Sequence, residues 1–407
     1  MKSIIIFSGH YNVKVNGSTK EVDENLVKYI DLKKHQVVWI GVGVNKEIDT
    51  NLTNRIIDIN DEYKILKLFV KFLNMMKRIN LLSNSSVQYL LFVLYDYFLL
   101  KCVYKNKINI KDSILIARNA SATRFISKLK GKGLKTIIHA QWLHPKFQKK
   151  NVEKAYSNLG ISFNQKSFKL LKRQTLDFIL ADKIWTFSKF GANTFIRKGV
   201  PKEKIMIHKL GADKNKFNYL KNRLNEIVEL KSFKILFVGN ISPEKGVDFF
   251  LEYLMKSKLE GLKVTFLGNV EKNFNNYFFK NINKLLDKGI HCEVKSGDSS
   301  HEYLNADLLI LPSIHDSFGL VVPEALMSGL PVLVSSNSGA SELIKNNYQG
   351  QIFSSNNMED FSCKLENLIK NKFFFRENKK SLSQKSQVFD WESVYNDFSK
   401  KILNELF

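Results

Sequence analysis

Short apolar runs separated by stretches of helical periodicity dominate the first half of the chain. Five runs have the length and the continuous hydrophobicity of buried strands: residues 3–7, 35–42, 112–118, 134–140 and 182–188. The segment between the first two runs carries apolar residues at helical spacing. Buried strands that alternate with helices predict a parallel sheet whose strands are joined by crossover helices.

The second half of the chain repeats this pattern. Its strand-like runs are residues 233–239, 262–268, 290–297, 307–313 and 330–336. The sequence therefore predicts an α/β protein with two doubly wound, Rossmann-like domains that face each other across a cleft. We place the joint near residues 208–217. In such domains ligands bind at the carboxyl ends of the strands.

Residues 64–107 depart from the alternating pattern. Lysines alternate with Leu, Phe and Met at helical spacing over residues 64–82, and a second apolar stretch, residues 87–105, is interrupted by Asp96. A basic amphipathic helix can lie in an anionic membrane surface. The alternative is a core helix whose lysines cover its edges. No uncharged apolar span of 18 residues occurs, so we expect no transmembrane helix.

Charge is distributed unevenly along the 407 residues. The formal net charge is +24, and residues 1–205 hold 37 Lys and Arg against 15 Asp and Glu. Nucleic acid, anionic lipid headgroups and phosphorylated substrates are the partners that such a domain favours. The sequence carries no RRM, KH, zinc-finger or helix-turn-helix signature, so we do not expect nucleic-acid binding.

The three cysteines and the N-terminal residues narrow the class further. No CxxC spacing occurs, which argues against a disulfide framework and a zinc site and favours a reducing compartment. The first apolar run has five residues, which is too short for the core of a signal peptide.

The stretch HDSFGLVVPEALMSGLPVLVSS, residues 315–336, carries the clearest chemistry. Pro323 suits the first turn of a helix that begins near Val321, and Gly329 suits its C-terminal cap. The backbone amides of residues 318–320 then lie at or just before a helix N-terminus, where anions and hydroxyl oxygens bind.

Two carboxylates flank this turn. Glu324 falls in the first helical turn, where it can accept both hydroxyls of a ribose, and Asp316 lies where it can accept the hydroxyls of a neighbouring sugar. Taken alone, Glu324 would only interact with the helix dipole and Asp316 would be a turn residue. The full pattern of spacing is what favours a binding site.

This stretch resembles the donor-site signature of the retaining GT-B glycosyltransferases of the GT4 family, the glycosyl transferases group 1. In that signature an acid precedes a Phe-Gly pair and a Glu follows the acid by eight residues. Asp316 stands where the family usually has Glu, whereas Phe318, Gly319 and Glu324 match.

A second segment, FVGNISPEKGVDFF (residues 237–250), resembles the family segment in which an Arg and a Lys hold the donor diphosphate. Lys245 matches the Lys, and Asn240 occupies the usual Arg position. Asn offers only a neutral donor to a phosphate. The replacement implies weaker donor binding or compensation by another basic residue.

The resemblance also implies roles outside these two segments. His139, at the end of a predicted strand, would hydrogen-bond the sugar and stabilise developing charge, with His144 as the alternative. Gly17 would face the diphosphate or the acceptor. Gly268 and the backbone of 294–297 match places that hold the nucleobase, and the choice between UDP and GDP stays open.

The resemblance divides the chain into an acceptor-binding domain, residues 1–212 joined by the C-terminal helix 388–407, and a donor-binding domain, residues 213–387. It implies retaining transfer from a UDP- or GDP-sugar, by front-face attack or through a covalent intermediate. No Asp-x-Asp triplet occurs, so we expect no metal and no other cofactor. We expect a lipid-linked or membrane-proximal glycan acceptor in bacterial surface polysaccharide synthesis, and an enzyme on the inner face of the cytoplasmic membrane.

The implied catalytic residues are His139, Lys245 and Asp316. The implied donor-binding residues are Gly17, Asn240, Lys245, Gly268, Asp316, Phe318, Gly319, Leu320 and Glu324. Three alternatives stay open: a GT-B enzyme with a soluble acceptor, a nucleotide-sugar epimerase, and a non-catalytic GT-B-like binding protein.

Overall fold

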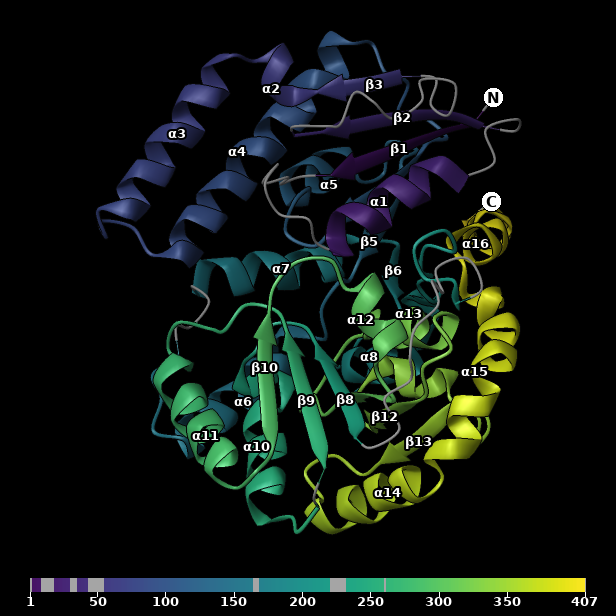
Figure 1. Cartoon of the computed structure of the whole chain (residues 1–407). Coiled ribbons are helices and arrows are strands. Elements are labelled where there is room, and N and C mark those ends of the chain that lie inside the picture. Colours follow the sequence, from purple (N-terminus) through teal and green to yellow (C-terminus); the bar gives the residue numbers. More distant parts are fainter. Residues whose placement is uncertain are drawn as a thin grey trace.

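The computed structural model contains two parallel sheets with helices packed around them (Figure 1). It describes residues 2–8, 18–29, 35–42, 55–163, 168–219, 232–259 and 261–406. Every pair of neighbouring strands runs parallel. The predicted α/β class with two parallel sheets is confirmed.

The first sheet has seven strands in the order β3-β2-β1-β4-β5-β6-β7. They are β1 (Lys2–Ser8), β2 (His35–Gly41), β3 (Arg55–Asp58), β4 (Ile114–Arg118), β5 (Lys135–His139), β6 (Lys183–Thr186) and β7 (Ile205–Ile207). The five predicted strands are present. The sequence analysis missed β3 and β7, which are edge strands of four and three residues.

The helices of this half are α1 (Ser18–Tyr29), α2 (Ile59–Glu62), α3 (Ile65–Arg78), α4 (Asn84–Lys105), α5 (Thr123–Leu129), α6 (Pro145–Asn158), α7 (Phe168–Leu180) and α8 (Lys189–Ile196). Helices α3 and α4 lie side by side at one end of the molecule (Figure 1). The predicted basic helix is α3 and the second apolar stretch is α4.

Helix α4 contains the buried Asp96, whose carboxylate organises its surroundings. It accepts hydrogen bonds from the backbone amides of Arg124 (2.6 Å) and Phe125 (2.9 Å) in the first turn of α5, and it pairs with the guanidinium of Arg173. By length and composition α4 is the one helix among the described residues that is long and apolar enough to cross a membrane. Asp96 and the buried apolar residues of α4 pack within the first half of the chain, whereas Leu90, Val93 and Tyr104 are exposed.

The second sheet has six strands in the order β10-β9-β8-β11-β12-β13. They are β8 (Phe233–Val238), β9 (Leu262–Leu267), β10 (His291–Lys295), β11 (Leu308–Leu311), β12 (Val332–Ser335) and β13 (Gly350–Phe353). All but the edge strand β13 were predicted. The helices are α10 (Val247–Lys256), α11 (Asn275–Asp287), α12 (Ser300–Asn305), α13 (Val321–Met327), α14 (Met358–Lys370), α15 (Lys372–Ser386) and α16 (Trp391–Leu406).

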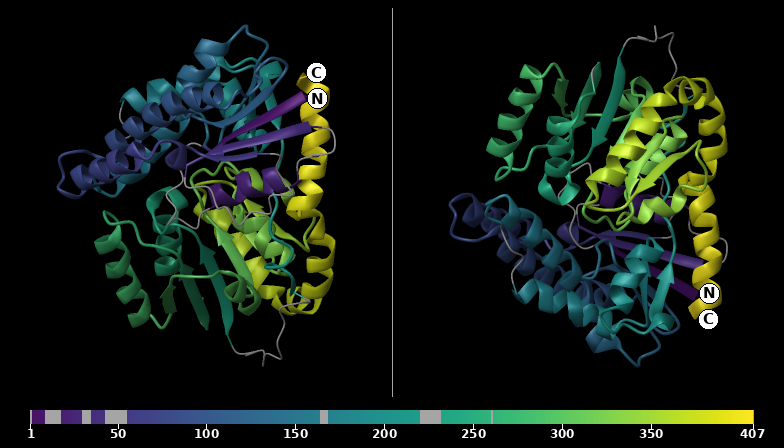
Figure 2. Two further views of the ribbon diagram at one scale, coloured as in Figure 1. Left: turned by 90° about the horizontal axis from the view of Figure 1, so that it is seen from above. Right: turned by 90° about the horizontal axis from the view of Figure 1, so that it is seen from below.

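The last helix returns to the first half of the chain. The views in Figure 2 show α15 and α16 running along one side of the molecule from the second sheet to the first. The ring of Phe398 lies 4.1 Å from the ring of Trp185 in β6, and the hydroxyl of Tyr395 donates to the backbone oxygen of Val22 in α1 (3.2 Å). These contacts tie α16 to the first sheet.

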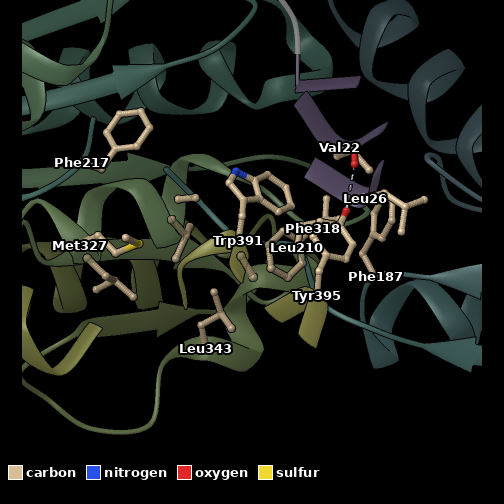
Figure 3. Close-up of a cluster of buried hydrophobic side chains, with 14 of the residues drawn as sticks. Val22, Leu26, Phe187, Leu210, Phe217, Phe318, Met327, Leu343, Trp391 and Tyr395 are labelled. Atoms are coloured by element: carbon tan, nitrogen blue, oxygen red, sulfur yellow. Dashed lines mark hydrogen bonds between the residues drawn. The ribbon is translucent and has the colours of Figure 1, made fainter. Parts of the chain in front are cut away.

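One buried hydrophobic cluster joins the two halves (Figure 3). It brings together Leu26 from α1, Phe318 and Met327 from the second half, and Trp391 and Tyr395 from α16. A shared core of this kind fixes the carboxyl ends of both sets of strands relative to each other. The division of the chain at residues 212 and 387 stays a prediction.

Candidate active site

A cavity of about 1090 Å³ lies between the two halves of the molecule. Residues from the first half line one wall: Val22, Glu24, Gln141, Trp142, Phe187 and Leu210. The remaining lining residues, from the second half, are Lys216, Val238, Gly239, Lys245, Gly297, Asp298, Ser299, Leu311, Asp316, Ser317, Phe318, Gly319, Leu320, Val321 and Glu324. The cavity thus collects most of the motif around Asp316.

The loop between β11 and α13 holds Asp316 rigidly. The backbone nitrogen of Asp316 donates to the oxygen of Asn337 (2.9 Å), and the amide of Gly339 donates to the oxygen of Asp316 (3.0 Å). The carboxylate of Asp316 also accepts a hydrogen bond from the amide of Phe318 (3.2 Å). Phe318 itself is buried in the shared core, so it anchors the loop beneath the cavity.

Gly319 is required by both conformation and space. Its φ of +94° lies in the left-handed region, and an added Cβ would lie 2.8 Å from the Cδ2 atom of Leu311. Helix α13 begins at Val321, as predicted. Within the described parts of the chain, the amides of Gly319 and Leu320 donate no hydrogen bond, so both can bind a ligand that enters the cavity.

Lys245 and Asp316 form an ion pair at the cavity wall. The Nζ–Oδ2 distance is 2.5 Å, and 28% of the Lys245 side chain is exposed. Burial acts to lower the pKa of Lys245, but the carboxylates of Asp316 and Glu244 outweigh it and raise that pKa above its usual value. Lys245 is therefore a cation at neutral pH.

A glycine brings Lys245 to this position. Gly246 follows Lys245 with a φ of +70°, and an added Cβ there would lie 2.0 Å from the backbone oxygen of Pro312. Only a residue without a side chain lets the two loops approach this closely. Gly246 therefore has to follow Lys245, because a larger residue would collide with the Pro312 backbone and move Lys245 away from Asp316.

Glu324 lies in the first turn of α13 and meets a tyrosine that sequence reasoning missed. The hydroxyl of Tyr303, on α12, donates to the Oε2 atom of Glu324 (2.6 Å). Tyr303 is fully buried, and burial together with the Glu324 carboxylate raises the pKa of its hydroxyl well above the usual value. Tyr303 therefore holds one oxygen of Glu324 as a neutral donor.

Asn240 and Gly268 lie off the cavity wall. Asn240 is exposed, and it is not among the residues that line the cavity. Gly268 has a φ of +152°, and an added Cβ would lie 1.9 Å from the oxygen of Gly239, which does line the cavity. Gly268 thus supports Gly239 from behind. In the segment 294–297, Gly297 lines the cavity.

His139 is buried behind the cavity wall. Its ring stacks on Trp185 at 4.4 Å and meets the edge of Phe187 at 4.9 Å. Burial and the nearby Arg118 lower the pKa of His139 well below its usual value, so the imidazole is neutral. Its Nε2 atom has no hydrogen-bond partner among the described residues. Phe187, not His139, lines the cavity here.

His144 caps a helix, and Gly17 lies outside the described residues. The Nδ1 atom of His144 accepts the amide of Lys146 in the first turn of α6 (3.3 Å). Burial, with smaller effects from Lys198 and Lys146, lowers the pKa of His144 to about 4. A neutral imidazole is the form that accepts this hydrogen bond.

Sequence reasoning also missed an ion pair at the cavity, between Lys216 and Asp298 (2.7 Å). Burial acts to raise the pKa of Asp298, but hydrogen bonds from Lys216 and Ser300 lower it to about 2. Lys216 lies in the predicted joint between the two halves, where no local motif marks it. No motif marks Glu24 or Trp142 either, and these two were missed as well.

Comparison with known proteins identifies relatives of both the sequence and the fold. Residues 221–388 match the family model described as glycosyl transferases group 1. An uncharacterised glycosyltransferase of Methanocaldococcus jannaschii is 27% identical over 213 residues, covering 46% of this chain and 58% of the relative. A lipopolysaccharide 1,2-N-acetylglucosaminetransferase of Salmonella typhimurium is 26% identical over 186 residues, covering 42% and 48%. The chain thus spans about half the length of these relatives.

Solved structures resemble the whole chain. Sucrose-phosphate synthase from Thermosynechococcus elongatus superposes with a TM-score of 0.70 at 13% identity, covering 99% of both chains. HepE from Anabaena, in complex with UDP, superposes with a TM-score of 0.65 at 15% identity, covering 100% of both chains. The predicted GT-B fold is confirmed.

Proposed function

Because residues 221–388 belong to the glycosyl transferases group 1 family, we propose that this chain moves a sugar from a nucleotide-sugar donor to a glycan acceptor, with retention at the anomeric carbon. The observation that carries the proposal is the meeting of Lys245, Asp316 and Glu324 around one cavity. A nucleotide sugar presents hydroxyls on both sides of a charged diphosphate. The carboxylates of Asp316 and Glu324 can accept hydrogen bonds from these hydroxyls, and the ammonium group of Lys245 can bind the diphosphate.

The donor is bound from the side of the second sheet. Glu324 accepts the ribose hydroxyls, Lys245 and the amides of Gly319 and Leu320 bind the diphosphate, and Asp316 accepts hydroxyls of the transferred sugar. Transfer breaks the bond between the anomeric carbon and a diphosphate oxygen, where negative charge grows. The cationic Lys245 stabilises that charge.

We propose that this transfer needs no divalent metal, because Lys245 and the backbone amides meet the charge of the leaving diphosphate. Within the described ranges, no group of three or more His, Cys, Asp or Glu side chains is placed to hold a metal ion. Lys216, the other lysine among the described lining residues, is our candidate for the charge that Asn240 lacks, and it would have to leave its partner Asp298 to bind the diphosphate. UDP- and GDP-sugars are both candidate donors; the neighbour HepE binds UDP.

We propose a lipid-linked or membrane-proximal glycan acceptor in bacterial surface polysaccharide synthesis. One relative is a lipopolysaccharide N-acetylglucosaminetransferase and another is a capsular polysaccharide biosynthesis glycosyltransferase of Staphylococcus aureus. Such an acceptor places the enzyme on the inner face of the cytoplasmic membrane.

Helix α3 supports this location. Only Leu66 and Leu73 of its residues are buried, while one face leaves apolar side chains 45% to 70% exposed: Ile65, Leu68, Phe69, Phe72, Met75 and Ile79. Basic side chains flank that face, namely Lys64, Lys67, Lys71, Lys77 and Arg78, and no acidic residue occurs from 64 to 81. An exposed apolar face with a basic border suits an anionic bilayer.

The donor site is tested by thermal unfolding with UDP, GDP, ADP and their common sugars, with and without EDTA. A nucleotide at about 100 times its Kd adds roughly 2.7 kcal/mol to the free energy of unfolding. We expect one nucleotide to raise the melting temperature equally with and without EDTA, and a nuclear magnetic resonance assay of the product to show retained anomeric configuration.

Lys245→Ala should abolish this nucleotide-induced shift and lower kcat roughly a hundredfold or more. Lys256→Ala is the matched control, because Lys256 is an exposed lysine on α10 that pairs with Glu252 and does not line the cavity. If no nucleotide stabilises the folded protein, the donor site is lost and the non-catalytic binding protein is favoured. If EDTA removes the shift, metal independence is wrong.

A further inference from the structure

Trp142 differs from the other three tryptophans of the chain. Trp39, Trp185 and Trp391 are buried, whereas Trp142 is 50% exposed and lines the cavity. An indole left half in solvent at a concave site is typical of a surface that a ligand covers. The side chain therefore needs a functional explanation that packing does not supply.

The backbone around Trp142 is fixed from both sides. The amide of Ala140 donates to the oxygen of Trp185 (2.9 Å), and the amide of His144 donates to the hydroxyl of Thr194 (3.1 Å). The hydroxyl of Ser317 donates to the backbone oxygen of Gln141 (2.8 Å). Gln141 precedes Trp142 in the chain, and Ser317 follows Asp316. The hydrogen bond between Gln141 and Ser317 therefore fixes the backbone of Trp142 relative to the donor motif.

Trp142 and the proposed donor contacts line the same cavity from different halves of the chain. Lys245, Asp316 and Glu324 all belong to the second half of the chain, and Trp142 and Glu24 belong to the first. A group bound against Trp142 would therefore meet the donor from the first half of the chain. Because the proposed donor contacts belong to the second half, the group in that place is the one that would receive the sugar.

The chemistry of this wall selects a ligand class. A pyranose ring has an apolar face of C–H groups that stacks on an indole, and polar hydroxyls at its edge that a carboxylate accepts. Among the described lining residues, Glu24 is the one charged group on this wall, beside Val22, Gln141, Phe187 and Leu210. Its negative charge disfavours an acidic sugar.

We propose that Trp142 and Glu24 form the acceptor subsite, with Trp142 as the stacking surface for an uncharged pyranose ring and Glu24 as a hydrogen-bond acceptor that excludes uronic acids. This inference rests on the proposed glycosyltransferase function. It makes Trp142 and Glu24 specificity-determining residues for the acceptor.

Acrylamide quenching of tryptophan fluorescence tests the subsite directly, because acrylamide reaches an exposed indole far better than buried ones. The protein is saturated with the nucleoside diphosphate that stabilises it, and methyl glycosides of glucose, galactose and N-acetylglucosamine are compared with methyl glucuronide. We expect at least one neutral glycoside to protect Trp142 from acrylamide, and the glucuronide to give no protection.

Variants separate the subsite from the donor site. Trp142→Phe should remove the quenchable component and leave the nucleotide-induced thermal shift unchanged. Trp142→Ala should raise the KM for the acceptor roughly tenfold, whereas Phe373→Ala, which truncates an exposed aromatic residue on α15 outside the cavity, should leave it unchanged. Glu24→Gln should let methyl glucuronide protect Trp142.

The outcomes distinguish this inference from the proposed function. If a nucleotide stabilises the protein but no glycoside protects Trp142, the acceptor subsite is wrong and the donor site stands. If a nucleotide sugar alone protects Trp142, the residue belongs to the donor site and the assignment is overturned. If no nucleotide binds, the proposed function has failed before the subsite is reached.

Discussion

At the scale of single residues, the buried Asp177 makes a pH dependence that can be measured. Its carboxylate accepts hydrogen bonds from the amide of Ala120 (2.6 Å) and the hydroxyl of Thr123. Burial raises its pKa from 3.8 to about 7, against the opposing effect of Thr123 and Arg173. The native state then holds a proton that the unfolded state has already lost between pH 4 and pH 7.

The sign follows from this difference in bound protons. The free energy of unfolding falls as pH rises from about 4 to about 7, by up to about 4 kcal/mol from this one group. The Asn side chain of the Asp177→Asn variant does not titrate. The free energy of unfolding of the wild type minus that of the variant should therefore become smaller, or change sign, as pH rises from about 4 to about 7. Urea unfolding at pH 5 and pH 8 measures it, and an equal difference at both pH values would contradict the prediction.

Buried histidines, among them His139, His144 and His208, act in the opposite direction and are the reason for comparing variants rather than absolute stabilities. Burial lowers the pKa of His144 and of His208 to about 4. Each stays neutral in the native state while the unfolded chain takes up a proton below pH 6.5, so the free energy of unfolding falls as pH falls through that range. Their contribution is common to wild type and Asp177→Asn, and it cancels in the difference.

The sequence predicted the cavity-lining residues that lie in two short motifs, Lys245 in residues 237–250 and the others in residues 315–336. Asp316, Gly319 and Glu324 share a single strand-turn-helix unit, so their spacing alone indicates a common site. Tyr303 supports Glu324 from another helix, and Trp142 lies across the cavity. Their positions depend on packing between distant segments, which no local pattern encodes.

At the scale of elements, the sequence offered two interpretations of residues 64–107, a helix on a membrane surface or a core helix. Helices α3 and α4 correspond to one interpretation each. Asp96 interrupts the apolar pattern of α4 because its carboxylate caps α5 and pairs with Arg173. The core-helix alternative therefore describes α4. Helix α3 leaves its apolar face exposed, and the membrane hypothesis depends on α3 alone.

The double variant Leu68→Asp/Phe72→Asp tests that hypothesis. Both side chains are exposed on the apolar face of α3, so the fold should persist while insertion into a bilayer is penalised. We expect wild-type protein to float with phosphatidylglycerol vesicles at low salt and the variant to stay unbound. Val388→Asp, at an exposed apolar residue elsewhere, is the control and should bind as wild type does.

Two results would contradict a membrane role for α3. The first is equal flotation of wild type and the double variant. The second is a wild-type dimer, measured by light scattering, that the double variant converts to a monomer, because the exposed face would then join two copies of the chain.

The strands show the limits of pattern reading at this scale. The missed strands β3, β7 and β13 all have three or four residues and are edge strands of their sheets. The four-residue strands β6, β11 and β12 were predicted because each lies in a longer apolar run, which the missed strands lack. Gly350 opens β13 because an added Cβ would lie 1.9 Å from the oxygen of Val332, so close packing, not β propensity, determines its place.

At the scale of the whole molecule, the donor loop is held by both halves of the chain. The hydroxyl of Ser188, which caps α8, donates to the backbone oxygen of Ser317 (2.8 Å), and the amide of Phe190 donates to the carboxylate of Glu342 (3.0 Å). Gly339 lies between these groups: an added Cβ would be 2.4 Å from both the Ser188 hydroxyl and the Ser317 oxygen. The contact of the two halves thus leaves no room for a methyl group.

Gly339→Ala should therefore push the two halves apart at this contact. Gly339 is hydrogen-bonded to Asp316, whose proposed partner is the transferred sugar, and not to Lys245 or Glu324, so the Kd for the nucleoside diphosphate should change less than kcat. The acceptor wall moves away from the donor, and kcat should fall by roughly a hundredfold, the cost that a displacement of about 1 Å can have. Small-angle X-ray scattering should report a larger radius of gyration for the variant.

Ser188→Ala is the matched control for bulk, because it removes the two hydrogen bonds of the Ser188 hydroxyl, to the Ser317 oxygen and from the Gly191 amide, without adding an atom. Its kcat should fall far less than that of Gly339→Ala, since the two halves can still approach. If Gly339→Ala keeps both the radius of gyration and kcat of the wild type, this contact does not set the relative position of the halves. If it loses nucleotide binding as well, the contact positions the donor loop itself, and the cavity depends on the closed arrangement for both of its walls.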